Sequence, residues 1–396
     1  MLFADCISTR QPIAPPPFAL GRFQPVRKHA AGFSLVEIMV GMVIGLLAMI
    51  VMMQMLALFE GQKRSSTGGG DAQNSGAIAL HGIQRDLKQS GYGINQLSML
   101  GCSVTLRPGV TLNSLAPVTI NSTQITGQDS NTDTLLVVYS QSNSPTEGNG
   151  INAQPTAINK YQVRTPSAFQ VGDIVISVPK TRLSPCTLSM ETVTSIDATN
   201  SLVQVPNGVA GMVGGLLFNL GPSVKVLAYA VRGGKLTVCD YMANDCSSNS
   251  AAFWPAIASD IVSMKAEYGR DTSAVPMTGI ASTFDRTTPA STSATLSCDW
   301  LRILSVSLAL VARSSQYNKE VVTNTAVNSA AAPNPPVNAP TWSGNSRNAI
   351  VASTSVLGPD TSVDEPWKHY RYKVFQTTVP LRNNDWMVAV GAQRGC

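Results

Sequence analysis

Charged side chains are scarce in this chain of 396 residues: Asp, Glu, Lys and Arg make up 13%, and the formal net charge is +5. Residues 1–32 carry Arg10, Arg22, Arg27 and Lys28 against one acid, so +3 of that charge belongs to the first segment. The remaining residues carry only +2, too little for a chain built around a polyanion. The composition therefore argues against a nucleic-acid partner.

Residues that commonly carry catalysis or metal binding are also sparse. The chain has three histidines and seven cysteines, and no two cysteines stand in a Cys-x-x-Cys spacing. Structural zinc sites commonly use such pairs, so we expect no metal centre. No Ser/His/Asp arrangement is visible, and the glycines at 68–70 lack the Gly-Lys-Ser/Thr ending of a phosphate-binding loop. We expect no enzymatic activity and no cofactor. A membrane-anchored periplasmic enzyme is a rival hypothesis, and the lack of these motifs argues against it.

Apolar side chains concentrate in one run, residues 33–59. It reads FSLVEIMVGMVIGLLAMIVMMQMLALF, with Glu37 as its one charged residue. As a helix this run is about 40 Å long, against roughly 30 Å of bilayer hydrocarbon. The basic residues precede it, which predicts a cytoplasmic N-terminal side and an exported C-terminal part. A cleaved secretory signal has a shorter apolar region, so we interpret the run as a spanning helix, with a simple signal anchor as the alternative.

The residues at the start of the run are more specific. The sequence Gly32-Phe33-Ser34-Leu35-Val36-Glu37 resembles the processing site of type IV prepilins. This resemblance implies that prepilin peptidase cuts between Gly32 and Phe33 on the cytoplasmic face and methylates the new terminus at Phe33. Residues 1–32 would then be a cleaved cytoplasmic leader.

Glu37 is an unfavourable residue for a membrane helix, since a charged side chain at the helix centre opposes insertion by about 2.5–3.5 kcal/mol. If Phe33 becomes the N terminus, its amine lies about one helical turn from Glu37, or near the Glu37 of a neighbouring subunit. Pairing would offset the desolvation of both charges and set the axial register of packed helices. We therefore interpret Glu37 as an assembly residue; the alternative places it at headgroup depth.

Removing the leader removes Cys6 and leaves an even set of six cysteines, all beyond the spanning helix. An oxidising compartment predicts disulfides between them. Cys239 and Cys246 bracket a short polar loop and are the expected pair. The other four, whose pairing the sequence leaves open among three possibilities, are Cys102, Cys186, Cys298 and Cys396.

The helix is expected to be interrupted at residues 68–70, with Asp71 as the N-cap of its continuation. Within 71–90 an apolar stripe should pack on a sheet, and it consists of Gly76, Leu80, Ile83 and Leu87. The polar residues expected to face away are Gln84, Arg85, Asp86 and Lys88. The glycines at 91 and 93 should end the helix.

Alternating and β-branched residues predict strands over the later chain. The expected strands are 133–140, 171–178, 224–231, 235–240, 261–269, 301–313 and 370–380. Gly233-Gly234 predicts a hairpin between two of them, and the alternation within 301–312 predicts a half-buried strand. Residues 141–156, 281–297 and 325–346 are expected to be loops, and the last is long enough to be mobile.

Further segments resemble the PilW-type minor pilins of type IV pili; they are 83–92, 132–135, 169–173, 268–271, 308–313 and 377–383. This resemblance implies an α+β, pilin-like fold, in which a long N-terminal transmembrane and assembly helix packs on an antiparallel sheet of an enlarged β-rich head. The implied domains are the leader 1–32, the transmembrane and assembly helix 33–59, its periplasmic continuation 60–95 and the head 96–396.

The same resemblance implies a minor pilin that primes pilus assembly at the inner membrane and sits at the tip, with roles in cell adhesion and twitching motility. The implied partners are prepilin peptidase, other minor pilins, the major pilin, the inner-membrane assembly platform and membrane lipid. The protein would span the inner membrane once, with its head in the periplasm, and then reach the pilus at the cell surface. A pseudopilin of a type II secretion system shares this anchor and is the alternative.

Overall fold

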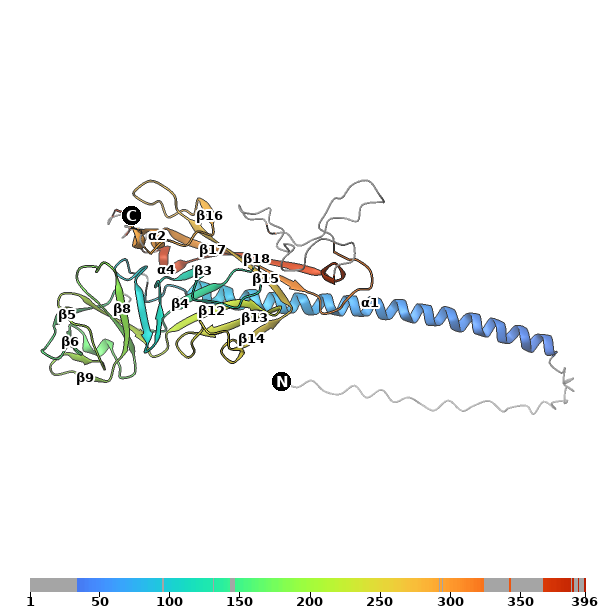
Figure 1. Cartoon of the computed structure of the whole chain (residues 1–396), viewed down its shortest axis with the longest axis horizontal. Helices are drawn as coiled ribbons and strands as arrows, with labels where there is room; N and C mark the ends of the chain where they lie inside the picture. The colour runs from blue at the N-terminus through green and yellow to red at the C-terminus, as the bar shows by residue number, and fades with distance from the viewer. Residues whose placement is uncertain are drawn as a thin grey trace, which may run out of the picture. The chain divides into compact units, whose positions relative to one another are not determined.

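The computed structural model describes residues 34–94, 96–130, 132–142, 147–291, 293, 295–323, 342, 366–385, 387, 391 and 395–396, without the side chains of 64 and 65. The chain divides into two units, Met1–Glu60 and Gly61–Cys396. One helix, α1 (Leu35–Gln89), begins in the first unit and ends in the second, and three β-sheets follow it in sequence (Figure 1).

α1 is one uninterrupted helix of 55 residues, so the expected break at residues 68–70 is wrong. Two of its glycines lie where a side chain would collide with the head. A Cβ atom on Gly68 would lie 2.9 Å from Cγ of Gln316, and one on Gly76 would lie 2.2 Å from Cε2 of Phe375. Glycine disfavours a helix interior by about 1 kcal/mol, but at these two positions its small size permits close packing against the head. A Cβ atom on Gly69 or Gly70 would have no neighbour within 4 Å.

The expected apolar stripe is confirmed, because Ile83 and Leu87 are fully buried against the sheets. Two other expectations for this segment are wrong. Asp71 lies inside the helix and is not an N-cap, and Asp86 does not face solvent but is 3% exposed. The helix ends at Gln89, where the following Gly91 adopts φ +80° and donates its N–H to a strand carbonyl. Only glycine adopts that conformation without strain.

A five-stranded antiparallel sheet has the order β14-β13-β12-β4-β3. Its strands are β3 (Val118–Ile120), β4 (Leu135–Tyr139), β12 (Lys225–Arg232), β13 (Lys235–Asp240) and β14 (Ala256–Ser259). The hairpin between β12 and β13 is confirmed: Arg232 pairs with Lys235 across Gly233 and Gly234, which have φ +56° and +67°. Positive φ at both central residues is what a type I′ turn requires.

Both faces of this sheet are buried. Successive side chains on a strand point to opposite sides, so each strand contributes to two cores. On β4, Leu135 and Val137 join a core that includes α1, whereas Leu136 and Val138 join a second core shared with a nine-stranded sheet.

The nine-stranded sheet has the order β2-β1-β8-β7-β11-β5-β6-β10-β9, and all its neighbouring pairs are antiparallel except β1 and β8. Its strands are β1 (Ser103–Arg107), β2 (Val110–Leu112), β5 (Asn149–Ala153), β6 (Lys160–Val163), β7 (Ile174–Val178), β8 (Thr187–Thr192), β9 (Ser195–Asp197), β10 (Leu202–Gln204) and β11 (Leu216–Gly221). Most were not expected, because they are short and lack a clear alternating pattern. They account for the enlargement of the head.

A four-stranded antiparallel sheet has the order β16-β15-β17-β18. Its strands are β15 (Ile261–Arg270), β16 (Thr283–Asp285), β17 (Ile303–Arg313) and β18 (Tyr372–Pro380). Every β17 residue except Arg313 is buried, so the expectation of a half-buried strand is wrong. Its second face is covered as well, where Ala309 and Val311 pack with Trp342.

Short helices complete the described fold: η1 (Pro166–Ala168), η2 (Ala251–Phe253), α2 (Leu296–Leu301), η3 (Pro366–His369) and α4 (Arg382–Asp385). Every expected strand is present, with ends shifted by a few residues. The loop expected at 141–156 contains β5, and the one at 281–297 contains β16 and the start of α2. The loop at 325–346 lies outside the described residues except for Trp342. The α+β, pilin-like class, with a long N-terminal helix and a large β head, is confirmed.

Candidate functional site

The first part of α1 exposes a continuous apolar surface. Each large apolar side chain from Leu35 to Phe59 is between 48 and 74% exposed. Within the described residues, α1 is the one helix that is long and apolar enough to cross a membrane, by length and composition alone. An apolar surface of this extent marks a site for lipid or for other helices.

The single acidic residue of this segment lies at its beginning. Glu37 is exposed, and its N–H donates a hydrogen bond of 2.9 Å to the carbonyl of Ser34 in the first turn of α1. The expected cleavage residues, Gly32 and Phe33, lie outside the described residues. The structure therefore locates Glu37 at the N-terminal end of the apolar helix.

The other end of α1 carries a buried carboxylate that contacts two strands. Asp86 accepts hydrogen bonds from the hydroxyls of Tyr139 on β4, at 3.3 Å, and Tyr229 on β12. Burial and the adjacent Asp86 carboxylate raise the pKa of Tyr139 to about 12, and they also raise the pKa of Tyr229. Arg85 lies 3.3 Å from Asp86, but its side chain is 68% exposed, so this ion pair contributes little. The two tyrosines fasten α1 to the five-stranded sheet.

A second buried carboxylate, Asp133, joins the start of β4 to β15. It accepts hydrogen bonds from the amide of Asn121 at 3.0 Å and from the backbone N–H of Ala266 at 2.9 Å. It also pairs with the guanidinium of Arg286. Asp133 is 2% exposed, so these partners offset the desolvation of its charge.

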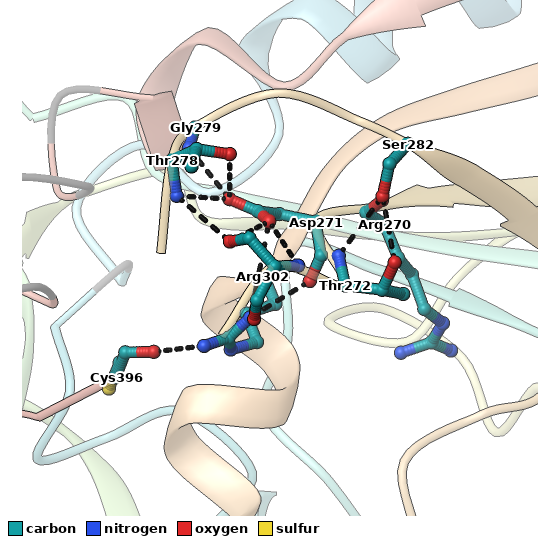
Figure 2. Close-up of polar contacts among 9 residues, drawn as sticks. Arg270, Asp271, Thr272, Thr278, Gly279, Ser282, Arg302 and Cys396 are labelled. Atoms are coloured by element: carbon teal, nitrogen blue, oxygen red, sulfur yellow. Dashed lines mark hydrogen bonds and ion pairs between the residues drawn. The ribbon is translucent and has the colours of Figure 1, made fainter. Parts of the chain in front are cut away.

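A third buried carboxylate, Asp271, organises the loop after β15 (Figure 2). One of its oxygens accepts the N–H of Ser273 at 2.9 Å, and the other accepts the N–H groups of Thr278 and Gly279, both at 2.7 Å. Burial by itself would raise the pKa of Asp271, but these hydrogen bonds outweigh it and hold that pKa well below its usual range. The carboxylate is therefore charged and closes the loop around itself.

Arg302 links this loop to the C terminus. Its Nη1 atom donates to the carbonyl oxygens of Asp271, at 3.1 Å, and Ser273, at 2.7 Å. Its Nη2 atom donates to the carbonyl of Cys396, as Figure 2 shows. Cys396 also forms a disulfide with Cys298. The last residue of the chain is thus held covalently and by a hydrogen bond.

All six cysteines after residue 33 are paired in the structure. Cys239 and Cys246, the pair that their spacing favoured, form one disulfide. The remaining bonds, which the sequence left open, are Cys102–Cys186 and Cys298–Cys396. Full pairing fits an oxidising compartment.

No group of three or more His, Cys, Asp or Glu side chains among the described residues is placed to hold a metal ion. The buried aspartates hold the fold together rather than converge on one reactive centre. Sequence reasoning did not single out Asp133 and Asp271. One local signal was available for Asp271: a serine stands two residues later, which favours an aspartate turn.

The long helix and β-rich head define a membrane-anchored, pilin-type protein, and comparison with protein families makes the class more specific. Residues 27–53 match the prokaryotic N-terminal methylation motif, and residues 231–383 match the Type IV pilus-assembly protein W, PilW. In these two segments the chain is therefore similar to the prepilin-like proteins of the PilW type, which belong to type IV pili. The corresponding comparisons with curated proteins and with solved structures gave no match.

The matched segments cover different parts of the molecule. The methylation motif spans the expected cleavage site and most of the apolar run, including Glu37. The PilW match includes the four-stranded sheet, Asp271 and Arg302. The nine-stranded sheet, Asp86 and Asp133 lie outside both matches.

Proposed function

We propose that this chain is a minor pilin that is cut between Gly32 and Phe33 by prepilin peptidase, methylated at Phe33, and incorporated into a type IV pilus. The observation that carries the proposal is the form of α1. Its first part is apolar and exposed, with one acid at its N-terminal end, and it continues without a break into a helix that Asp86 fastens to the head.

Cleavage before Phe33 places a new amine about one turn from Glu37. In a bundle of such helices, the amine of one subunit pairs with the Glu37 carboxylate of its neighbour. Pairing of the two charges offsets the cost of removing each from water, and it specifies axial position because misregistered helices leave both charges unpaired. Glu37 is thus the register residue for assembly.

The C-terminal part of the same helix is fastened to the head. The hydrogen bonds of Asp86 to Tyr139 and Tyr229 fix α1 against the five-stranded sheet. The head also carries the additional nine-stranded sheet, which is bulky for a subunit repeated along a filament. A subunit of this form suits the priming complex and the pilus tip, where it would meet other minor pilins, the major pilin and the assembly platform.

The protein first spans the inner membrane once, with its head in the periplasm, and then reaches the cell surface in the pilus. The three disulfides support an exported head. The buried aspartates have structural partners, so the proposal includes no enzymatic step.

Deletion of the gene, followed by complementation with the full chain, tests this proposal. We expect deletion to reduce surface pili and twitching motility while secretion of type II substrates continues, and complementation to restore both pilus phenotypes. The opposite pattern, normal pili with failed secretion, would assign the protein to a type II secretion system as a pseudopilin.

A further inference from the structure

A polar cleft of about 390 Å³ opens between the loop that joins β3 to β4, the middle of β15 and the residue that follows β16. Its lining is formed mainly by amide, hydroxyl and charged side chains; those used below are Thr123, Gln128, Asp133, Lys265 and Arg286. None of the described lining residues is aromatic. The cleft therefore suits a polar ligand better than an apolar one.

The loop that forms one wall is held in place at several points. The carboxylate of Asp129 accepts the N–H groups of Gly233 and Gly234, at 2.8 and 2.9 Å, in the β12–β13 turn. Asn121 accepts the N–H of Thr134 at 3.0 Å through its side-chain oxygen. These bonds fix the wall before any ligand arrives, which reduces the ordering cost of binding.

Among the described residues, the charges that line the cleft do not balance. Asp133 and Arg286 form an ion pair, so their charges compensate. Lys265 is half-buried on β15, yet no carboxylate among the described residues lies within 4.0 Å of its ammonium group. Glu267, two residues further along β15, lies on the same face of the strand. Burial of its side chain lowers the pKa of Lys265.

Two neutral groups in the lining have free hydrogen-bonding capacity. Neither the amide of Gln128 nor the hydroxyl of Thr123 takes part in a hydrogen bond within the described part of the chain. Together with Lys265 they offer one positive charge, several donors and two acceptors. That combination matches one carboxylate and a small number of hydroxyl groups.

We propose that this cleft is a binding site for a hydroxylated carboxylic acid of monosaccharide size, a uronic acid, whose carboxylate pairs with Lys265 and whose hydroxyls contact Gln128 and Thr123. One cation without a counter-ion among the described residues matches a single carboxylate better than a doubly charged phosphate. The hydroxyl and amide lining distinguishes a sugar acid from a simple fatty acid, which would need apolar walls.

Titration calorimetry with glucuronate as the probe tests this site on the full-length protein in detergent micelles. We expect glucuronate to bind, and Lys265→Met to weaken binding at least about tenfold, since it removes a charged hydrogen bond while keeping the aliphatic stem. Lys265→Arg should retain affinity within about threefold because it keeps the charge. Lys160→Met, a half-exposed lysine of β6 outside the cleft, is the matched control and should leave binding unchanged.

Gln128→Ala provides a second variant at an exposed position that does not threaten folding. It should weaken glucuronate about threefold or more, as expected for one neutral hydrogen bond, and leave propionate binding unchanged. Glucose, which lacks the carboxylate, should bind more weakly than glucuronate.

Three results would overturn the proposal. Absence of glucuronate binding, or equal binding by wild type and Lys265→Met, would contradict the existence of the proposed site. If propionate bound as tightly as glucuronate, the sugar hydroxyls would contribute nothing to binding, which contradicts the proposal. Tighter binding of N-acetylglutamate amide would assign the cleft to an acidic protein side chain instead of a sugar acid.

Discussion

Asp86 on α1 accepts a hydrogen bond from the hydroxyl of Tyr229 on β12, which lies 143 residues later in the chain. Asp86 is the buried charge that fastens the long helix to the head, and it accepts a second hydrogen bond from Tyr139. The C-terminal part of α1 is therefore joined to the head by a polar contact as well as by apolar packing.

Asp86→Ala should lower the free energy of unfolding of the full-length protein by about 3 kcal/mol, because it leaves two buried tyrosine hydroxyls without an acceptor. Tyr229→Phe should lower it by about 1.5–3 kcal/mol. Urea denaturation measures both, and the double variant should show a coupling of at least about 0.5 kcal/mol. Arg85→Ala, next to Asp86 but exposed, is the control and should change stability by less than about 0.5 kcal/mol. Additive effects of the two variants would contradict direct contact.

Asp271→Asn should destabilise the head at neutral pH and make its stability less sensitive to acid. The folded pKa of Asp271 lies below its unfolded value of about 3.9. Its stabilising contribution is therefore complete above that unfolded value and is lost as the pH falls below it towards the folded pKa. Chemical denaturation at a series of pH values should show the largest difference between wild type and variant near neutrality, about 2 kcal/mol for the charged hydrogen bonds. A difference that grows in acid would contradict the assignment.

Replacing disulfides with serine pairs should have unequal effects on stability. The Cys298–Cys396 bond spans 98 residues and Cys239–Cys246 spans 7, so loop closure predicts losses of about 4–5 and about 2–3 kcal/mol respectively. Non-reducing peptide mapping of the wild type checks the pairing first. Thermal unfolding of the two double-serine variants then checks the order, and a larger loss from the shorter loop would contradict it.

Glu37→Ala should leave cleavage and membrane insertion normal, since it removes an unfavourable charge from the spanning helix. Assembly should fail, because the terminal amine of a neighbouring subunit would enter the bundle without a partner, at a cost of several kcal/mol. Glu37→Gln should behave in the same way, as it keeps the size and loses the charge. Processing, membrane abundance and surface pili are measured separately in a strain without the native copy. Glu60→Gln, at the other end of the run, is the matched control, and normal piliation in both Glu37 variants would contradict the register role.

Elements with strong local signals were predictable from the sequence. The spanning run, the Gly91 helix end, the Gly233-Gly234 turn and the long strands were all identified. The break at residues 68–70 was not real: α1 continues through all three glycines, of which Gly68 packs closely against Gln316. Such contacts join residues far apart in the chain and have no local signature.

The buried aspartates show the same limit at the candidate site. Asp86, Asp133 and Asp271 each lie in a segment used to identify the family resemblance, and each is no more than 3% exposed. The sequence marked those segments but not the roles of their carboxylates. Asp86 was expected to face solvent, since its tyrosine partners come from distant strands.

The mass of the mature protein tests the central claim most directly. Intact-protein mass spectrometry on membrane fractions should show the loss of residues 1–32 and the addition of one methyl group on Phe33. In a strain without prepilin peptidase, the full-length mass should remain. A mature N terminus beyond residue 59 would remove the apolar helix from the protein, and would contradict the account of this chain as a pilin.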